Sequence, residues 1–433
     1  MTDNIFASDF RAESYWWTAA PRPNDPTPAE IPTKTDVAIV GSGYTGLSAA
    51  LTLARAGRNV VVLEAGTPGY GASSRNAGYV GKTLKHSFGT LLQSLGKRPA
   101  TQIFGEMQAA FDCVSNLIRD EQIECHYQEC GRFMAARSAQ QYEEMAKELE
   151  VKRKYLGDTY EMIPKSRQHE ILGIDRFYGG ALIPDLAGVH PGLYHLGLLE
   201  RVKRAGVTIL GNTKVTRITH ERSDFTVTTS NGQLDARNVF VATNGYTGKE
   251  MPWYHRRLIP FRGFMIATEE LPEEQLSKVF PQHRTNHDYS HNLIHFRRAP
   301  DSQRILFGGL TGTMTDDLPL MAKRLHSKLA ETVPDLAAVK ISRAWNGFCA
   351  GTFDLYPHIG VHEGVHYAMG YCFAGLPMGT YLGQKAALQI LGDQSGATVF
   401  GQRDFSTKWW YTGKPWFLPL FMAHYNWLDS KAR

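Results

Sequence analysis

The sequence predicts an α/β (α+β) fold in which a Rossmann-like domain is interleaved with a domain built on an antiparallel sheet. Three observations support this prediction. The chain has 433 residues, more than one hydrophobic core comfortably holds. Residues 36–64 carry a strand, a glycine-rich loop, a helix and a second strand in succession. Residues 264–308 contain several short apolar runs typical of antiparallel strands.

The composition excludes several classes of protein. Hydrophobic residues make up 42% of the chain, enough to bury a large core. The 47 Lys and Arg residues against 42 Asp and Glu leave a net charge of +5, too small and too dispersed to indicate a nucleic-acid partner. No apolar run reaches about 18 residues, and the N-terminus lacks a signal-peptide pattern. We therefore expect a cytoplasmic protein with no transmembrane segment.

The two ends of the chain differ from the rest in composition. Residues 1–32 are predicted to form an N-terminal arm, because five prolines between Pro21 and Pro32 prevent regular structure. Residues 396–433 form an aromatic C-terminal segment. Five of its residues share one face of an expected helix: Phe417, Leu420, Phe421, His424 and Leu428. We expect this face to pack against the body of the protein, and a weak membrane or subunit contact is the alternative.

The first strand–helix–strand unit carries a dinucleotide-binding pattern. Residues 36–40 and 59–63 are apolar runs typical of buried parallel strands, and residues 45–56 favour a helix. Between them, residues 41–46 read Gly-Ser-Gly-Tyr-Thr-Gly, a loop that lets backbone amides at a helix N-terminus approach a pyrophosphate. Glu64 ends the second run, where a carboxylate can accept hydrogen bonds from a ribose. The sequence therefore predicts a bound dinucleotide.

A second loop rich in small residues follows at 71–81. Its small side chains suit a backbone that passes close to a large flat cofactor, and its hydroxyls with Arg75 can neutralise a pyrophosphate. Taken alone, the loop would be interpreted as a flexible Gly/Ser segment.

The rest of the chain alternates helices and strands. Helices are expected at 102–121, 138–155 and 193–205, and a hairpin is expected at 125–136 with its turn near Gly131. The expected strands are residues 207–210, 215–218, 225–228, 238–242, 264–268, 293–296 and 305–308. The five cysteines include no CxxC pair, which fits reduced thiols and gives no metal site.

Taken together, the loops at 41–46 and 71–78 resemble the D-amino-acid-oxidase-type (DAO) superfamily of FAD-dependent oxidoreductases. Three later segments are similar to the same superfamily: residues 238–245, 345–360 and 367–383. Within the superfamily, the resemblance is greatest to gamma-glutamylputrescine oxidoreductases, and it includes the aromatic N-terminal arm and residues 187–191.

This resemblance implies how the domains are built. It divides the FAD-binding domain into three stretches, 33–122, 191–250 and 341–395. The substrate-binding domain then comprises residues 123–190 and 251–340.

The resemblance also implies that FAD is bound without a covalent bond, since Gly347 occupies the position of the flavin-linked cysteine of sarcosine-oxidase-like members. Matched one by one to the family motifs, the residues expected to bind FAD are Gly41, Gly43, Tyr44, Thr45, Gly46, Glu64, Ala65, Ser73, Ser74, Arg75, Asn76, Ala77, Gly78, Val215, Thr243, Gly245, Gly375, Leu376, Pro377, Met378 and Gly379.

The activity implied by the resemblance is oxidation of the C–N bond of an amine similar to gamma-glutamylputrescine, as in polyamine catabolism. A hydride would pass to flavin N5, giving an imine or aldehyde. Hydrogen peroxide follows if oxygen is the acceptor, and an electron carrier is the other option. Cys349 stands where amino-acid-oxidising relatives have a carboxylate-binding arginine, which disfavours free α-amino acids.

Three alternatives stay open. The first is a dehydrogenase or oxidase of N-methylated or secondary amino acids. The second is a flavin-containing binding protein without turnover, and the third is an NAD enzyme that uses the same fingerprint. Residues 310–317 contain no lysine of the kind that sarcosine oxidases use toward oxygen, so oxidase and dehydrogenase are both compatible with the sequence.

Three residues are candidates for the substrate side of the flavin. The resemblance places His190 there. The alternative interpretation is that His190 caps the helix that begins near Pro191. Trp345 and Tyr371 are expected to form pocket walls, with plain core packing as the alternative. One further group has strand-like spacing, so that alternate members share a face: His287, Tyr289, His291, His295 and Arg297. We do not assign a metal site to this group, because it lacks Asp, Glu and Cys ligands.

Overall fold

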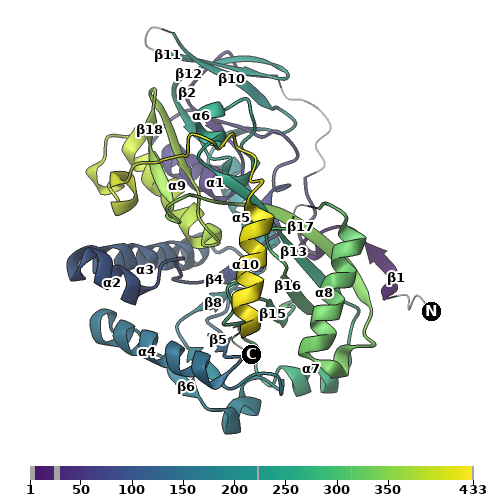
Figure 1. Ribbon diagram of the computed structural model, residues 1–433. Helices are drawn as coiled ribbons and strands as arrows, with labels where there is room; N and C mark the ends of the chain where they lie inside the picture. Colours follow the sequence, from purple (N-terminus) through teal and green to yellow (C-terminus); the bar gives the residue numbers. More distant parts are fainter. Residues whose placement is uncertain (1–4, 24–29, 222–223, 314, 432–433) are drawn as a thin grey trace.

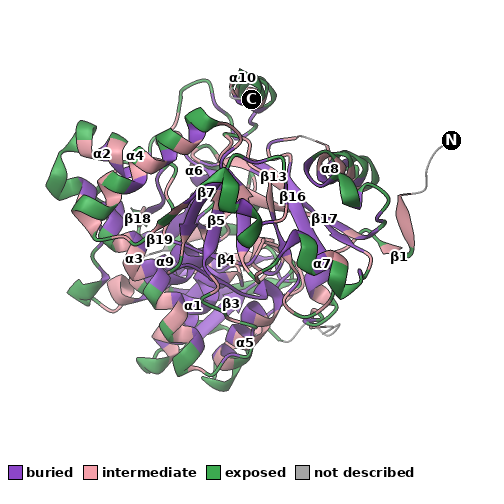
Figure 2. Cartoon of the chain, turned by 90° about the horizontal axis from the view of Figure 1, so that it is seen from below, coloured by how far each residue is buried: buried purple, intermediate pink, exposed green. Residues whose placement is uncertain are grey.

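A computed structural model describes residues 5–23, 30–221, 224–313 and 315–431 (Figure 1). Two large sheets with helices around them make up the molecule, so the predicted α/β class is confirmed. Figure 2 shows strands β3 (Val60–Leu63), β5 (Arg132–Ala135), β13 (Ile259–Thr268) and β16 (Ile305–Gly309) in the buried interior, whereas helices α2 (Phe88–Leu95), α4 (Ala139–Leu156) and α8 (Leu318–Thr332) expose one side at the periphery. Among the described residues, no helix has the length and apolar character needed to cross a bilayer.

The first sheet has eight strands and a parallel centre. Its parallel strands are β2 (Lys34–Val40), β3 (Val60–Leu63), β9 (Thr208–Leu210), β12 (Gly232–Val241) and β19 (Val365–Met369). Its antiparallel strands are β10 (Val215–Glu221), β11 (Asp224–Thr229) and β18 (His358–His362). All four residues of β3 are buried, as expected for a strand covered on both faces.

Alternate residues of the central strands enter two different cores. Val37 and Ile39 of β2 pack with the helices on one face, whereas Ala38 and Val40 pack with the strands β10 to β12 on the other. The covering helices are α1 (Tyr44–Arg55), α3 (Lys97–Asp120), α5 (Pro191–Arg204) and α9 (Gly375–Ile390). The strand period of two thus divides each strand between the two layers.

The second sheet has nine strands and is mainly antiparallel. In spatial order they are β1 (Phe6–Arg11), β17 (Ile341–Gly351), β13 (Ile259–Thr268), β16 (Ile305–Gly309), β15 (His295–Arg298), β14 (Thr285–Asp288), β5 (Arg132–Ala135), β7 (Gly180–Ile183) and β6 (Glu161–Ile163). Helices α7 (Glu273–Val279) and α8 (Leu318–Thr332) lie on its outer face (Figure 1). Its inner face carries Met265, Leu306 and Trp345, which pack with Ala77 of the glycine-rich loop at 71–81.

The remaining elements lie around the two sheets. They are the short strand pair β4 (Tyr79–Val80) and β8 (Ala187–Gly188), and the helices α2 (Phe88–Leu95), α4 (Ala139–Leu156), α6 (Pro252–His255) and α10 (Leu418–Lys431). The three helices expected at 102–121, 138–155 and 193–205 are therefore confirmed as α3, α4 and α5.

The hairpin expected at 125–136 is wrong. Residues 132–135 form β5, but its partners are β14 and β7, from much later in the chain. Within residues 125–131, all of which the structure describes, the only strand-like pairing is an isolated bridge between Gln128 and Gly188. The turn glycine between two apolar runs fits a hairpin pattern. The hydrogen bonds of β5 are instead made with β14 and β7, which are distant in the sequence.

The division into domains stays a prediction, and two strands cross its boundaries. β1, within the predicted arm 1–32, pairs with β17. β17, within the predicted FAD-binding stretch 341–395, pairs with β13 and so lies in the second sheet. Residues 24–29 of the arm lie outside the described residues.

The expected packing of the aromatic C-terminal face is wrong. The helix forms as α10, but Leu420 and Phe421 are 70% and 53% exposed. Contact with the body comes instead from the opposite side, where Leu418 and Asp429 are buried. The Asp429 carboxylate accepts hydrogen bonds from the backbone amides of His291 and Asn292. This polar anchor, which an apolar pattern does not reveal, sets the rotation of the helix.

Candidate functional site

The glycines that open α1 are required by close backbone contacts. Gly41 has φ +105°, and a Cβ there would lie 3.0 Å from the carbonyl oxygen of Ala242 at the end of β12. A Cβ at Gly46 would lie 1.9 Å from the carbonyl oxygen of Gly41. A Cβ at Gly43 would lie 2.9 Å from Ser73 Oγ. The loop is therefore held tightly against β12 on one side and residues 72–74 on the other.

The N-terminus of α1 faces the second glycine-rich loop. The backbone amide of Tyr44 donates to Ser73 Oγ at 3.0 Å, so a polar oxygen already lies at this positive end of the helix. A pyrophosphate oxygen is a stronger acceptor of the same kind of bond. The glycine backbone and the free helix end therefore fit the pyrophosphate of a dinucleotide.

Glu64 lies at the end of β3, close to the glycine loop. Its carboxylate accepts hydrogen bonds from the Ser42 amide at 2.9 Å and the Ser42 hydroxyl at 2.7 Å. The backbone oxygen of Glu64 accepts from the Thr213 amide at 2.7 Å, which places the start of β10 beside it. Ala65 is exposed, and Val215 is buried in the adjoining core. Contact of these residues with a ribose or an adenine stays a prediction.

The loop at 72–78 is braced by its own side chains and by the N-terminal arm. The Asn76 amide donates to the backbone oxygens of Ala72 and Ser73, and its Oδ1 accepts from the Gly78 amide. Ser74 is buried, and its hydroxyl accepts from the indole of Trp17 at 2.8 Å. Ser74 and Asn76 thus shape the loop whether or not they also touch a cofactor.

Arg75 links this loop to the second sheet and to the arm. One guanidinium nitrogen donates to the backbone oxygen of Asn346 at 3.0 Å. The guanidinium also lies 4.5 Å from the ring of Trp17 and 4.2 Å from that of Tyr70. A cation held between two aromatic rings contributes about 0.5–2 kcal/mol per contact.

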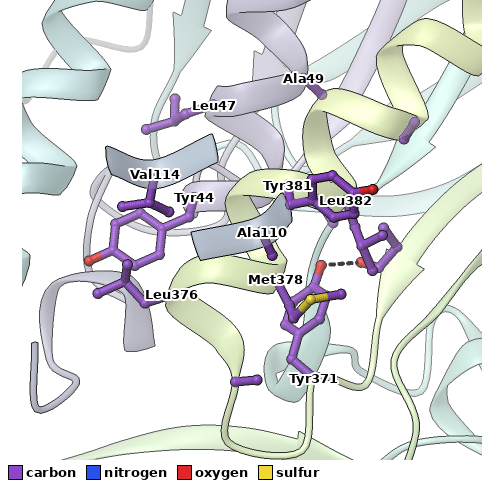
Figure 3. Close-up of a cluster of buried hydrophobic side chains, with 14 of the residues drawn as sticks. Tyr44, Leu47, Ala49, Ala110, Val114, Tyr371, Leu376, Met378, Tyr381 and Leu382 are labelled. Carbon is purple, nitrogen blue, oxygen red and sulfur yellow. Dashed lines mark hydrogen bonds between the residues drawn. The ribbon is translucent and has the colours of Figure 1, made fainter. Parts of the chain in front are cut away.

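Two later segments complete the surroundings of α1. The backbone nitrogen of Thr243 lies 3.6 Å from the Cβ position of Gly41, and a Cβ at Gly245 would lie 2.7 Å from the Cys349 oxygen. At the start of α9, a Cβ at Gly379 would lie 3.0 Å from Thr45 Oγ1. Leu376 and Met378 are buried in the core between α1 and α9, and Pro377 and Gly375 lie on the same first turn (Figure 3). The fold thus gathers segments separated by more than 300 residues around one helix end.

His190 has the geometry of a helix cap. Its Nδ1 accepts from the Leu193 amide at 3.1 Å at the start of α5, which confirms the cap described by the alternative interpretation. The side chain is fully buried, with its ring centroid 4.7 Å from that of Trp16. Its Nε2 lies 3.4 Å from Asp301 Oδ2. A catalytic role for His190 stays a prediction.

Trp345 and Tyr371 are buried, and each bonds to a segment that is distant in the sequence. The Trp345 indole donates to the Arg75 oxygen at 2.8 Å. The Tyr371 hydroxyl bonds to Thr45 Oγ1 at 2.7 Å and to the Ala368 oxygen at 2.8 Å, and the ring points into the core beside Met378 (Figure 3). These contacts support core packing, and a role as substrate-pocket walls stays a prediction.

The inner face of the second sheet has a floor without side chains. Gly263 of β13 lies opposite Gly347 of β17, and Met265 lies opposite Gly308 of β16. Paired residues point to the same face. A Cβ at Gly263 would meet no atom within 4 Å, so open space lies above this part of the sheet. We refer to this space as the recess.

The two ends of the recess have different chemistry. At one end, Phe261 of β13 lies opposite Cys349 of β17. At the other end, His295 of β15 lies opposite Gly308, and His287 of β14 lies opposite His295. Both histidines keep some exposed surface. The pKa of each is lowered to about 4, mainly by burial and in part by the positive charge of the nearby Arg132. Both imidazoles are therefore neutral at pH 7.

Phe373 and Lys85 lie across from Phe261. The rings of Phe373 and Phe261 are 4.7 Å apart, and Lys85 Nζ lies 4.3 Å from the Phe373 ring centroid. Cys372 and Phe373 have φ values of +48° and +80°, a conformation that side-chain-bearing residues rarely adopt. Such strain concentrates at functional sites. Burial also raises the pKa of Cys349 to about 12, which keeps this group a neutral thiol.

Sequence reasoning missed the residues of the recess. Gly263 carried the available signal, because a glycine inside a strand often marks a place where another group approaches the backbone. The histidines were placed on one strand face, but nothing local showed that this face borders open space. Lys85 and Phe373 enter the site only through contacts between distant segments.

Comparison with known proteins gives one consistent result. The family model described as DAO, FAD dependent oxidoreductase, matches residues 36–388. Gamma-glutamylputrescine oxidoreductase of Escherichia coli (strain K12) is 30% identical over 368 residues, which covers 84% of this chain and 85% of that protein. Probable oxidoreductase OrdL of Rhizobium meliloti (strain 1021) is 28% identical, covering 90% of this chain and 91% of its own.

Solved structures share the fold. Glycine oxidase from Geobacillus kaustophilus superposes with a TM-score of 0.71 at 22% identity, covering 87% of this chain and 99% of its own. L-proline dehydrogenase from P. horikoshii gives a TM-score of 0.70 at 18% identity, covering 86% of this chain and 96% of its own. Both likenesses concern the fold alone.

Proposed function

Because the chain belongs to the DAO family of FAD-dependent oxidoreductases, we propose that it oxidises the C–N bond of a primary amine similar to gamma-glutamylputrescine. The membership makes it an enzyme that uses FAD and acts on amine or amino-acid C–N donors. The choice of an amine over a free α-amino acid is the finer step. It is supported by the relative at 30% identity and by the chemistry of the recess.

The observation that carries this proposal is the character of the groups around the glycine floor. Cys349 is a neutral thiol opposite Phe261, so position 349 supplies no cation to an α-carboxylate beside the reacting carbon. Farther along the sheet lie the neutral imidazoles of His287 and His295. An alkylamine has a pKa of about 10 in water and must lose its proton before it can release a hydride. Poorly hydrated surroundings, to which we assign no acidic residue of the described part of the chain, favour that neutral form.

The chain's own residues position the reaction and exclude water. When bound, FAD supplies the hydride acceptor at flavin N5. Residues 41–46, the α1 amides and Ser73 would hold the pyrophosphate, and Glu64 would hold a ribose hydroxyl. The bare backbone of Gly263 leaves room for a flat ring or a slim alkyl chain against the sheet. The imine formed by loss of hydride then reacts with water to give an aldehyde.

The proposal includes the electron acceptor and the setting of the enzyme. Oxygen, giving hydrogen peroxide, or an electron carrier reoxidises the enzyme, and the protein works in the cytoplasm as part of polyamine breakdown. The exposed aromatic residues of the C-terminal segment add a weak contact with a membrane surface or another subunit.

Anaerobic bleaching of the oxidised flavin tests the substrate class. The FAD-loaded protein is mixed with gamma-glutamylputrescine, putrescine, N-methylglycine, glycine and proline in separate samples. We expect rapid bleaching with gamma-glutamylputrescine and slow or no bleaching with the amino acids. Bleaching by N-methylglycine or proline alone would move the substrate class to secondary amino acids. No bleaching by any amine would favour a binding protein without turnover, and admission of air afterwards separates an oxidase from a dehydrogenase.

A further inference from the structure

One end of the recess is strongly cationic. Arg132 on β5 lies in register with Thr285 on β14, and His287 follows on the same face two residues later. Lys85 reaches the same region from the segment between β4 and α2, with its ammonium over the Phe373 ring. The positive charges of Arg132 and Lys85 both act on His287. Two cations from distant parts of the chain thus converge on one imidazole.

The positive charges in this region have no acidic partner among the described residues. Arg132 is buried, and its guanidinium donates to the neutral Thr285 hydroxyl at 3.2 Å and the Val80 oxygen at 3.3 Å. Within the described part of the chain, no salt bridge involves Lys85. The nearest acidic residue in sequence to His287 is Asp288, and its carboxylate accepts from Ser290 and the Ile294 amide.

Leaving a cation poorly hydrated and unpaired is costly. Burial lowers the pKa of both Arg132 and Lys85, which reflects that cost. The guanidinium of Arg132 is committed to the protein, so it contributes a positive field rather than a free donor. Lys85 is an exposed residue beside Phe373 and has three N–H donors, of which none has a hydrogen-bond acceptor among the described residues. These donors are available to an anion.

We propose that Lys85 binds a carboxylate of the substrate beside the Phe373 ring, with Arg132 supplying a supporting positive field. The enzyme then selects amines that carry an acid group several bonds from the reacting carbon, and it rejects dications such as free putrescine. This inference rests on the proposed amine oxidation, whose reaction it leaves unchanged.

Lys85 lies beside a pair of aromatic rings. Its ammonium lies over the Phe373 ring, and that ring contacts Phe261 of β13. An acid at the end of a flexible chain could place its carboxylate at Lys85 while its apolar part lies against these two rings.

The first experiment measures anion binding without turnover. Glutarate, a dicarboxylate, is titrated into the FAD-loaded protein, and the change in flavin absorbance gives its dissociation constant. Replacing Lys85 by Met removes a charge-assisted hydrogen bond, so we expect glutarate binding to weaken about 10- to 100-fold. Lys85→Arg should keep it within about threefold. The matched control is Lys97→Met, an exposed lysine that also lies over an aromatic ring, Tyr155, and should change nothing.

The second experiment measures flavin reduction with two acylated putrescines that present the same free amine. Gamma-glutamylputrescine carries the acid at the end of its longer acyl chain, and N-acetylputrescine has no acid. For Lys85→Met we expect the apparent dissociation constant of the acidic amine to rise about tenfold or more, with the limiting reduction rate within about twofold. The acid-free amine should be unaffected. A merely structural role would alter both amines and the FAD content.

Two results would overturn the inference. One is equal glutarate affinity in the wild type and Lys85→Met, and the other is an equal loss for both amines in that variant. Failure of the proposed function is recognised separately, because it would leave the flavin oxidised with every amine while the glutarate titration still decides whether Lys85 binds an acid.

Discussion

Replacing Gly46 by Ala tests whether the glycine loop is as tightly constrained as the contacts indicate. The new Cβ would lie 1.9 Å from the Gly41 oxygen, 3.1 Å from the Gly41 carbonyl carbon and 3.3 Å from Ile39 Cγ2. Overpacking of this kind costs about 1–3 kcal/mol. We expect the upper end, about 3 kcal/mol, because the obstructing atom belongs to the backbone and has no rotamer to adopt.

Relief of that clash requires α1 to move away from the loop. The same movement displaces the amides proposed to hold the pyrophosphate, so FAD affinity should fall at least about tenfold, equivalent to about 1.4 kcal/mol. The assay combines urea unfolding of the apoprotein, followed by tryptophan fluorescence, with titration of FAD into the refolded apoprotein. Stability and cofactor affinity are thereby measured on the same preparation.

Gly105→Ala is the matched control for this substitution. Gly105 lies on the exposed side of α3, and a Cβ there would meet no atom within 4 Å. Alanine inside a helix is favoured over glycine by about 0.5–1 kcal/mol, so this variant should be slightly stabilised with unchanged FAD affinity. If Gly46→Ala matched the wild type within about 0.5 kcal/mol and kept full FAD affinity, the inferred constraint would be refuted.

Three further predictions follow from burial and charge. His287 and His295 have pKa values of about 4, below the unfolded value of about 6.5, so their contribution to stability is complete above pH 6.5 and is lost as the pH falls toward 4. Burial raises the pKa of Asp288 to about 6, so this carboxyl group changes stability in the opposite direction over the same pH range. The urea midpoints of the double variant His287→Gln/His295→Gln are therefore compared with those of the wild type at each pH. Identical dependence of the two midpoints on pH would contradict the prediction. Cys349, with a pKa of about 12, should resist iodoacetamide at pH 8 in the folded apoprotein and react after unfolding, and rapid labelling of the folded form would contradict the raised pKa. Trp416→Ser should change the unfolding free energy by less than about 0.5 kcal/mol, because Trp416 is 65% exposed, while lowering any binding to vesicles or self-association seen by sedimentation.

The sequence was most informative where function depends on local backbone geometry. Gly41 and Gly46 are needed for contacts within a single strand–loop–helix unit, so their spacing carries the prediction directly. The helices at α3, α4 and α5 were found for a similar reason, because an apolar period of 3.6 is a local property. His190 was described by two alternatives, and its bond to the Leu193 amide, only three residues away, supports the local one.

The hairpin and the C-terminal helix face show where local patterns fail. Residues on both sides of Gly131 satisfied a hairpin pattern, but β5 found its partners about 50 and 150 residues later in the chain. α10 has an apolar face that suggested burial, but the carboxylate of Asp429 fixes the opposite side to backbone amides near His291. In both cases a hydrogen-bonding requirement from a distant segment outweighed the apolar pattern.

The recess has the same origin, and that origin bears on specificity. Its floor comes from β13 and β17, its histidines from β14 and β15, and its lysine from the segment before α2. No single stretch of sequence therefore determines which substrate fits. The glycine loop can be kept for FAD while Lys85, Cys349 and Phe373 change independently, because they lie on three separate segments. Under the proposal above, position 349 carries a neutral thiol and Lys85 supplies the positive charge that meets a substrate acid. The FAD-binding framework would then stay the same while the substrate class changes with the position of one positive charge.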